Sequence, residues 1–209
     1  MTEPGNPQPA STERANTQPA SADRADTQPA GAEPANPRPT TEPPQSQRPD
    51  VAHLRTLYFV IHRTVRRNLE GVSHEESLRS PEPFGNNANW VLGHLVDSAE
   101  GVLGLLGQPR VLDSGALARY RRGTSPLIDA AEALPLERLL EVWDEASKRI
   151  NVGLKSIPEE RVDAPVPADL TWMGTTIGAA VAFVSFHQSY HAGQLGLLRR
   201  LLGKPGAIA

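Results

Sequence analysis

The large apolar residues of this chain recur at helical spacing in four segments, and this periodicity limits the fold more than any other feature of the sequence. They stand three or four positions apart, so each segment presents one apolar face. The expected helices run from about Pro49 to Glu70, from Asn87 to Leu106, from Leu134 to Ile157, and from Thr175 or Thr176 to Gly203. No alternating pattern of useful length indicates a strand. The sequence therefore predicts an all-α four-helix bundle.

Residues at the segment ends are consistent with these boundaries. Asn86, Asn87 or Asn89 could cap the second helix, because a short side-chain acceptor satisfies its first free N–H groups. Pro135 suits the start of the third helix, where a missing N–H costs nothing. The connection from Gly107 to Ala133 is long, so the second and third helices need not be antiparallel neighbours.

The first fifty residues differ from the rest of the chain. Residues 5–34 repeat with a period of ten, proline recurs, and no large apolar side chain lies between Met1 and Val51. Such a segment cannot bury enough surface to offset the entropy lost on ordering. We therefore predict a disordered, Pro-rich tail over residues 1–50 and a single domain over residues 51–209.

Composition excludes several classes of function. The chain has no cysteine, which removes a thiolate nucleophile, a disulfide framework and Cys-bound zinc. Its formal net charge of −3 argues against nucleic acid as a partner. No stretch is long and apolar enough to span a bilayer, and the first residues lack the apolar core of a signal peptide. We expect a cytoplasmic protein without a membrane partner.

His187 and His191 lie four residues apart in the last apolar segment. On a helix this spacing places two side chains about 40° apart around the axis and about 6 Å apart along it, so both imidazoles share one face. That face continues the apolar stripe of Val184 and Leu195. A shared metal ion is the strongest explanation for two adjacent imidazoles there, and the alternative is a pair of core histidines satisfied by hydrogen bonds.

His94 is the best candidate for a third ligand, because it lies on the apolar stripe of the second predicted helix. The remaining histidines, His53, His62 and His74, are expected at the surface or at a helix rim.

The chemistry of some familiar sites is missing. The pair reads His-Gln-Ser-Tyr-His, so no glutamate follows the first histidine as the base of a zinc protease. Asp97 and Glu100 lie off the expected ligand face, and we expect both at the solvated surface.

Two stretches resemble the DinB-like (damage-inducible, YfiT-type) four-helix-bundle superfamily. They are Asn89 to Leu95 (NWVLGHL) and Phe186 to Arg200 (FHQSYHAGQLGLLRR), and the third helix, including Ile157 to Arg161 (IPEER), is also similar. The resemblance extends from about Val51 to the C-terminus and does not include the tail. It implies an up-down-down-up bundle, which the long second connection permits, and it implies a homodimer.

The resemblance also implies a metal site. One histidine from the second helix and two from the fourth commonly bind a divalent metal in this family, which corresponds here to His94, His187 and His191. Three neutral imidazoles leave positions open for water or substrate, as in a reactive site. Zinc or nickel suits nitrogen ligands, and ferrous iron is also compatible.

Some members of the superfamily are thiol S-transferases, so the resemblance implies a metal-dependent enzyme whose partners are a low-molecular-weight thiol and an electrophilic small molecule. Two alternatives remain open: a metal-dependent hydrolase, and a non-catalytic, dimeric, stress-related bundle that acts through interactions. Catalytic side chains beyond the ligands are not indicated.

Several polar and aromatic residues could surround the site. Ser98 lies one turn beyond His94, and Gln194 lies three residues beyond His191, so either could orient a ligand or simply bond between helices. Tyr190 belongs to the fourth-helix motif. Trp172 could wall a pocket near the metal or close the end of the bundle, and the basic run from Arg119 to Arg122 could bind an anionic substrate or be solvated.

Overall fold

The computed structural model describes residues 49–81, 85–126 and 128–208. The predicted tail, residues 1–50, lies almost entirely outside the described residues. Within them, four long helices are present: α1 (Val51–Leu69), α3 (Ala88–Leu105), α4 (Leu136–Ser156) and α6 (Ile177–Leu201). Each begins and ends within about two residues of the bounds predicted from the periodicity. No strand occurs in the described ranges, apart from an isolated bridge between Pro165 and Thr176.

Side-chain caps explain where three of these helices begin. Asp50, Asn87 and Thr176 each accept a hydrogen bond from a backbone N–H in the first turn of α1, α3 and α6. At the start of α4, Pro135 offers no side-chain cap, and the N–H of Leu136 instead donates to Nδ1 of His74 at 3.3 Å. His74 therefore has a structural role at the rim of the bundle.

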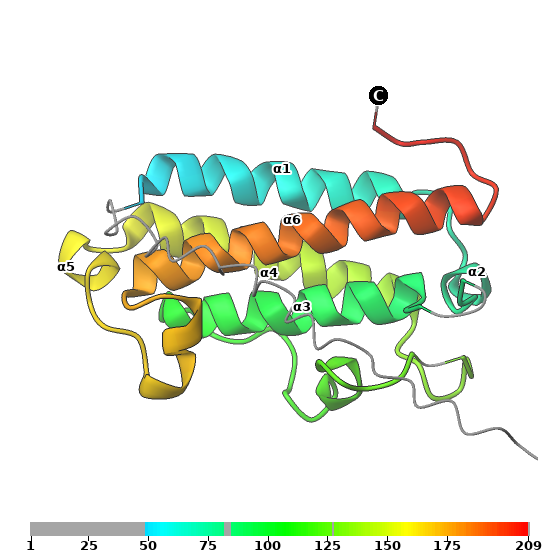
Figure 1. The fold of residues 1–209 in the computed structure, drawn as a ribbon, viewed down its shortest axis with the longest axis horizontal. Coiled ribbons are helices and arrows are strands. Elements are labelled where there is room, and N and C mark those ends of the chain that lie inside the picture. Colours follow the sequence, from blue (N-terminus) through cyan, green and yellow to red (C-terminus); the bar gives the residue numbers. More distant parts are fainter. Residues whose placement is uncertain (1–48, 82–84, 127, 209) are drawn as a thin grey trace, which may run out of the picture. The chain divides into compact units, whose positions relative to one another are not determined.

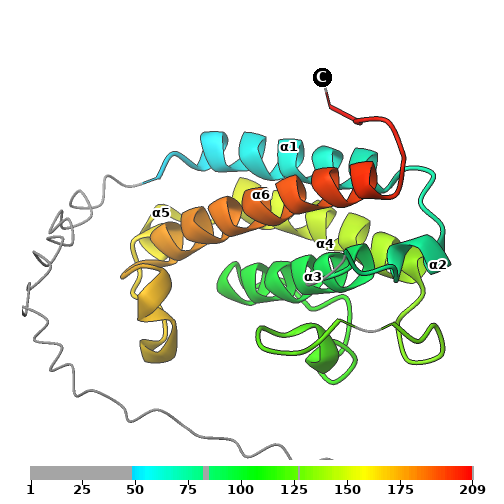
Figure 2. The ribbon, with the colours of Figure 1, turned by 45° about the vertical axis from the view of Figure 1, so that its right-hand side comes forward.

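The helices form the predicted up-down-down-up bundle. α1 and α6 run in one direction, and α3 and α4 run in the other (Figure 1). α1 packs against α4 and α6, and α3 packs against the same two helices. Because α3 and α4 are parallel neighbours, the chain must return along the bundle between them, and the connection from Gly107 to Ala133 makes this return outside the helices (Figure 2).

Four short helical segments join the long ones: α2 (His74–Ser77), the 3₁₀ turn η1 (Ala118–Tyr120), α5 (Glu159–Val162) and the 3₁₀ segment η2 (Ala168–Met173). The periodicity did not predict them, because a segment of three to six residues is too short to show a helical repeat.

The core lies between the four long helices and is almost entirely apolar. Residues from every long helix are fully shielded from solvent, including Val65, Leu95, Leu103, Leu139, Trp143 and Leu195. Burial of this surface is the main force that holds the helices together. None of the described helices has both the length and the apolar character needed to cross a bilayer.

Glu100 corrects one expectation, because its side chain is buried rather than solvated. One carboxylate oxygen accepts hydrogen bonds from the backbone N–H groups of Val111 and Leu112, both at 2.9 Å, and Arg110 Nε lies 3.6 Å from the other oxygen. Glu100 thereby fastens the start of the long connection to α3, and these partners offset the cost of burying its charge.

Gly93 allows the long connection to pack tightly on α3. A Cβ atom at this position would collide with the ring of Tyr120, which is fully buried.

We expect Gly93→Ala to lower the free energy of unfolding by about 1–3 kcal/mol, because overpacking outweighs the helix propensity of alanine. Gly101→Ala, on the same helix with open space around it, is the matched control and should be neutral or stabilising. Equal urea midpoints for the two variants would contradict this packing.

Candidate metal centre

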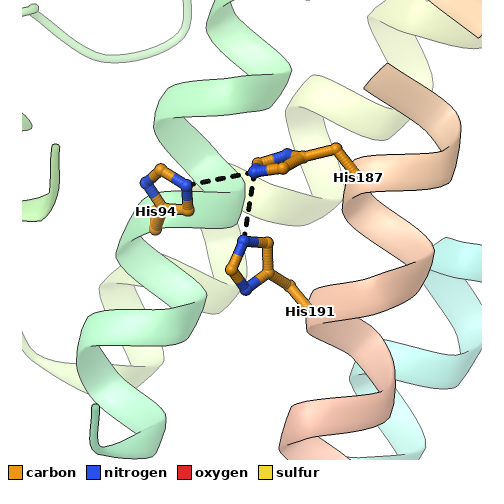
Figure 3. A group of neighbouring side chains, drawn as sticks. All are labelled: His94, His187 and His191. Carbon is orange, nitrogen blue, oxygen red and sulfur yellow. Dashed lines mark hydrogen bonds between the residues drawn. The ribbon is translucent and has the colours of Figure 1, made fainter. Parts of the chain in front are cut away.

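Three imidazoles from two helices meet in one cluster, the histidine triad of His94, His187 and His191. His94 projects from α3, and the other two project from successive turns of α6 (Figure 3). Nε2 of His187 lies 3.3 Å from Nε2 of His94 and 3.1 Å from Nε2 of His191. One ligand atom from each ring lies within 4.8 Å of the others. The i, i+4 spacing on α6 and the packing of α3 against α6 together create this arrangement.

A backbone carbonyl fixes the tautomer of His94. Nδ1–H of His94 donates to the carbonyl oxygen of Tyr120 at 2.9 Å, and a carbonyl can only accept. Nε2, which faces the triad, therefore carries a lone pair. The indole of Trp90 stacks on the same imidazole, with 5.0 Å between ring centroids and 16° between planes. Together these contacts hold the ring in place.

A side-chain amide orients His191 in the same way. Nδ1–H of His191 donates to Oε1 of Gln194 at 2.7 Å, and Nε2 of Gln194 donates to the hydroxyl of Tyr190 at 3.3 Å. The Tyr190 ring also packs edge-on against His191. Nε2 of His191 is therefore a second lone pair directed at the centre of the triad.

The surroundings disfavour protonation of His187 and His191. Burial, then the nearby His191 and His94, lower the pKa of His187 to about 4. Burial also lowers the pKa of His191, although its bond to Gln194 opposes this. Neutral imidazole is the form that binds metal, so these shifts keep His187 available well below pH 7 and favour the metal-binding form of His191.

The arrangement fits a divalent metal ion. In a tetrahedral site with metal–nitrogen bonds of about 2.0–2.1 Å, the ligand nitrogens are roughly 3.3 Å apart, which is close to the two short separations in the triad. Without an ion, lone pairs of His94 and His191 face a single Nε2–H of His187, which can donate to only one of them. The second-ring hydrogen bonds of His94 and His191 are those that metal ligands usually make. The triad can therefore hold a metal ion.

The triad opens into a cavity of about 310 Å³. Its lining combines the three histidines with residues from the start of α3 and from the long connection: Asn86, Trp90, Arg122, Gly123 and Thr124. None of these described lining residues is acidic. A larger cavity of about 770 Å³ lies between α1 and α4, but no cluster of three potential ligands occurs there among the described residues.

The other candidate residues lie in different relations to the triad. Ser98 accepts a hydrogen bond from Nε2 of Gln188 at 3.4 Å, whereas the second nitrogen of His94 bonds to Tyr120, so Ser98 does not orient His94. Trp172 is 66% exposed, packs edge-on against Phe183, and is not part of the cavity lining. His62 bonds to Asp144 at 2.8 Å, away from the triad.

No pattern in the sequence indicates the carbonyl of Tyr120 as a partner of His94, because any residue type provides a backbone oxygen. The sequence also does not indicate that Trp90 and Thr124 belong to the site. The indole N–H of Trp90 donates to Oγ1 of Thr124 at 2.9 Å, which joins α3 to the long connection beside His94. Only the folded chain brings these residues together.

Gln194 and Ser98 provide a matched test of ligand orientation. Gln194→Ala should weaken Zn²⁺ binding about 10- to 100-fold, because His191 loses the acceptor that fixes its tautomer. Ser98→Ala should leave Zn²⁺ affinity unchanged, because Ser98 bonds to Gln188. Competition with a chromophoric chelator measures both constants. Equal losses in the two variants, or none in Gln194→Ala, would contradict the proposed role.

One of the comparisons with known proteins identifies the family of the chain. A search of curated proteins finds no match to the chain. A family model described as "DinB superfamily" matches residues 56–195, a range that contains all three histidines of the triad. The match extends over more than half of the chain and agrees with the resemblance in α3 and α6. The chain therefore belongs to the DinB superfamily, a metal-binding superfamily.

Proposed function

We propose that this protein is a metal-dependent thiol S-transferase with one divalent ion bound by His94, His187 and His191. The observation that carries the proposal is the composition of the triad cavity: three converging imidazole nitrogens and, among the described lining residues, no carboxylate. A site of this kind can bind and ionise a nucleophile without a separate protein base.

Zinc, nickel and ferrous iron all suit three imidazole ligands. A divalent ion in this site would lower the pKa of a bound thiol, which then ionises near neutral pH. The chain has no cysteine, so the thiol must be a separate small molecule.

The protein residues have supporting roles in this proposal. The Tyr120 carbonyl and Gln194 hold the imidazoles of His94 and His191 in the orientation that ligation needs, and Trp90 covers one face of His94. The reaction joins the thiol sulfur to a carbon of an electrophile. The sulfur–carbon bond forms, the bond from carbon to its leaving group breaks, and the proton of the thiol passes to solvent.

Metal-dependent hydrolysis is the second enzymatic possibility, and the cavity favours it less. Hydrolysis usually relies on a side chain that moves protons between water and the leaving group. Asp97, the acidic residue nearest to His94 along α3, lies 4.0 Å from Arg121 in an ion pair and does not line the cavity.

We place the reaction in the cytoplasm, where low-molecular-weight thiols stay reduced.

We also propose that the protein is a homodimer that associates through α6. Phe186, Tyr190, Leu197 and Leu201 are each about 60–70% exposed. Their spacing places them within about 60° of one another around the helix. A second copy that covers this stripe would remove apolar surface from water.

Metal content and turnover test the enzymatic proposal. The wild-type protein, purified untagged, should contain about one divalent metal per chain by elemental mass spectrometry. It should also accelerate the conjugation of a small thiol to 1-chloro-2,4-dinitrobenzene. His187→Ala should lose both properties because it removes a ligand, whereas His53→Ala, an exposed histidine outside the triad, should keep both.

Each negative result has a definite meaning. Metal retained in His187→Ala would contradict the ligand assignment. A metal-loaded protein without thiol-dependent turnover, tested with a panel of cellular thiols, would rule out the transferase and favour the non-catalytic bundle.

Light scattering tests the dimer. The wild-type protein should have the mass of two chains, and Leu197→Glu should have the mass of one, because a charge in the apolar stripe opposes its burial. Val152→Glu changes an equally exposed apolar residue on α4 and should remain dimeric. A monomeric wild-type protein would refute the proposal.

A further inference from the structure

Arg122 stands out among the residues around the triad, because it is the one side chain with a permanent charge in the described lining of the cavity. The other described lining residues carry no permanent charge: the triad, Trp90, Asn86, Gly123 and Thr124. A guanidinium group remains protonated at all physiological pH values. The cavity is therefore cationic at one edge even before any metal binds.

The backbone around Arg122 is fixed on both sides. Before it, Tyr120 is fully buried, its hydroxyl donates to Oδ1 of Asn89 at 3.1 Å, and its carbonyl accepts from His94. After it, Oγ1 of Thr124 accepts from Trp90 at 2.9 Å. Both anchors connect to the same helix that carries His94. Arg122 therefore belongs to a segment whose position is coupled to the metal ligands.

The turn itself depends on Gly123. This residue has φ of +89°, a left-handed backbone conformation that glycine adopts without strain. The N–H of Thr124 donates to the carbonyl of Arg121 at 3.1 Å and closes the turn. A tight turn between two anchors restricts where the Arg122 backbone can move, so less entropy is lost when its side chain binds a ligand.

The neighbouring charges leave Arg122 available. Asp97, an acidic residue on α3, forms an ion pair with Arg121 at 4.0 Å and not with Arg122. Among the residues that the structure describes, no ion pair includes Arg122, and no acidic residue lines the cavity with it. An anion that enters the cavity would meet a charge without an internal competitor.

We propose that Arg122 forms an anion-binding subsite beside the histidine triad, and that the small molecule bound there carries a carboxylate next to its reactive group. The guanidinium donates two parallel N–H groups to the two oxygens of the carboxylate, a geometry that lysine cannot reproduce. The reactive end of the ligand then lies at the triad. The identity of that reactive end as a thiol rests on the proposed function, whereas the carboxylate preference rests on Arg122.

Two thiols of matched shape separate these claims. 3-Mercaptopropionate and 3-mercaptopropionamide have the same skeleton, but only the first carries a carboxylate. With Co²⁺ in the site, thiolate coordination produces a charge-transfer absorption band, and titration yields a dissociation constant for each thiol at a fixed thiolate concentration. The wild-type protein should bind the propionate about tenfold more tightly, which is what a charged hydrogen bond at an open site contributes.

Arg122→Gln should bind the two thiols with nearly equal affinity, because the paired charge is gone. Arg119→Gln removes the same charge from the same connection, at an exposed residue outside the cavity lining, and should keep the tenfold preference. Equal Co²⁺ stoichiometry and equal thermal midpoints in the three proteins would establish that Arg122→Gln folds and retains the metal site.

The outcomes distinguish the subsite from the reaction. Thiols that bind without a carboxylate preference, or a preference that persists in Arg122→Gln, would overturn the subsite and leave the transferase proposal intact. If no thiol produces a charge-transfer band, the transferase proposal fails, and propionate and propionamide then test the subsite through the d–d bands of Co²⁺. A stronger response to propionate that requires Arg122 would support the subsite, and equal responses would refute it.

Discussion

The contact between Tyr120 and α3 is the interaction on which the site depends most. The ring packs against Gly93, where no side chain intervenes, and the hydroxyl donates to Asn89 and accepts from the backbone N–H of Leu134. The carbonyl of the same residue selects the tautomer of His94. Tyr120 thus ties the middle of the long connection to α3, ties its end at Leu134 to the same place, and orients a metal ligand. The residues between Tyr120 and Thr124, including Arg122, are held beside the cavity as a result.

The topology makes this connection necessary. Because α3 and α4 are parallel neighbours, the chain has to travel the length of the bundle between them, and a tight turn cannot do so (Figure 1). Glu100 fastens the beginning of the returning segment, and Tyr120 with Thr124 fastens the part beside the triad. The segment that a simpler up-and-down bundle would lack thereby supplies one wall of the cavity.

Burial favours the metal-binding form of two histidines in the triad. Partial burial disfavours the charged imidazolium of His187 and His191, and the neutral imidazole that remains is the form that binds a metal. The Nδ1 hydrogen bonds of His94 and His191 face away from the centre. The three Nε2 atoms therefore bring to the centre either three lone pairs or two lone pairs and the single N–H of His187. A bound cation resolves that arrangement better than any proton placement, which is a physical reason to regard the triad as a metal centre rather than as a set of core histidines.

The sequence by itself determined the long helices and the histidine pair on α6, because both depend on spacing within a few residues. It limited the cap of α3 to three asparagines, of which the structure selects Asn87, whereas the cap of α1 at Asp50 was not predicted. Only the tertiary structure decided that Tyr120 orients His94, that Ser98 bonds to Gln188, that Glu100 is buried, and that Arg122 lines the cavity. The bond of Ser98 depends on how α6 packs against α3, and the other outcomes depend on how the long connection packs across α3. Such packing joins residues many positions apart through backbone groups that carry no residue-specific signal, so no local pattern could have indicated it.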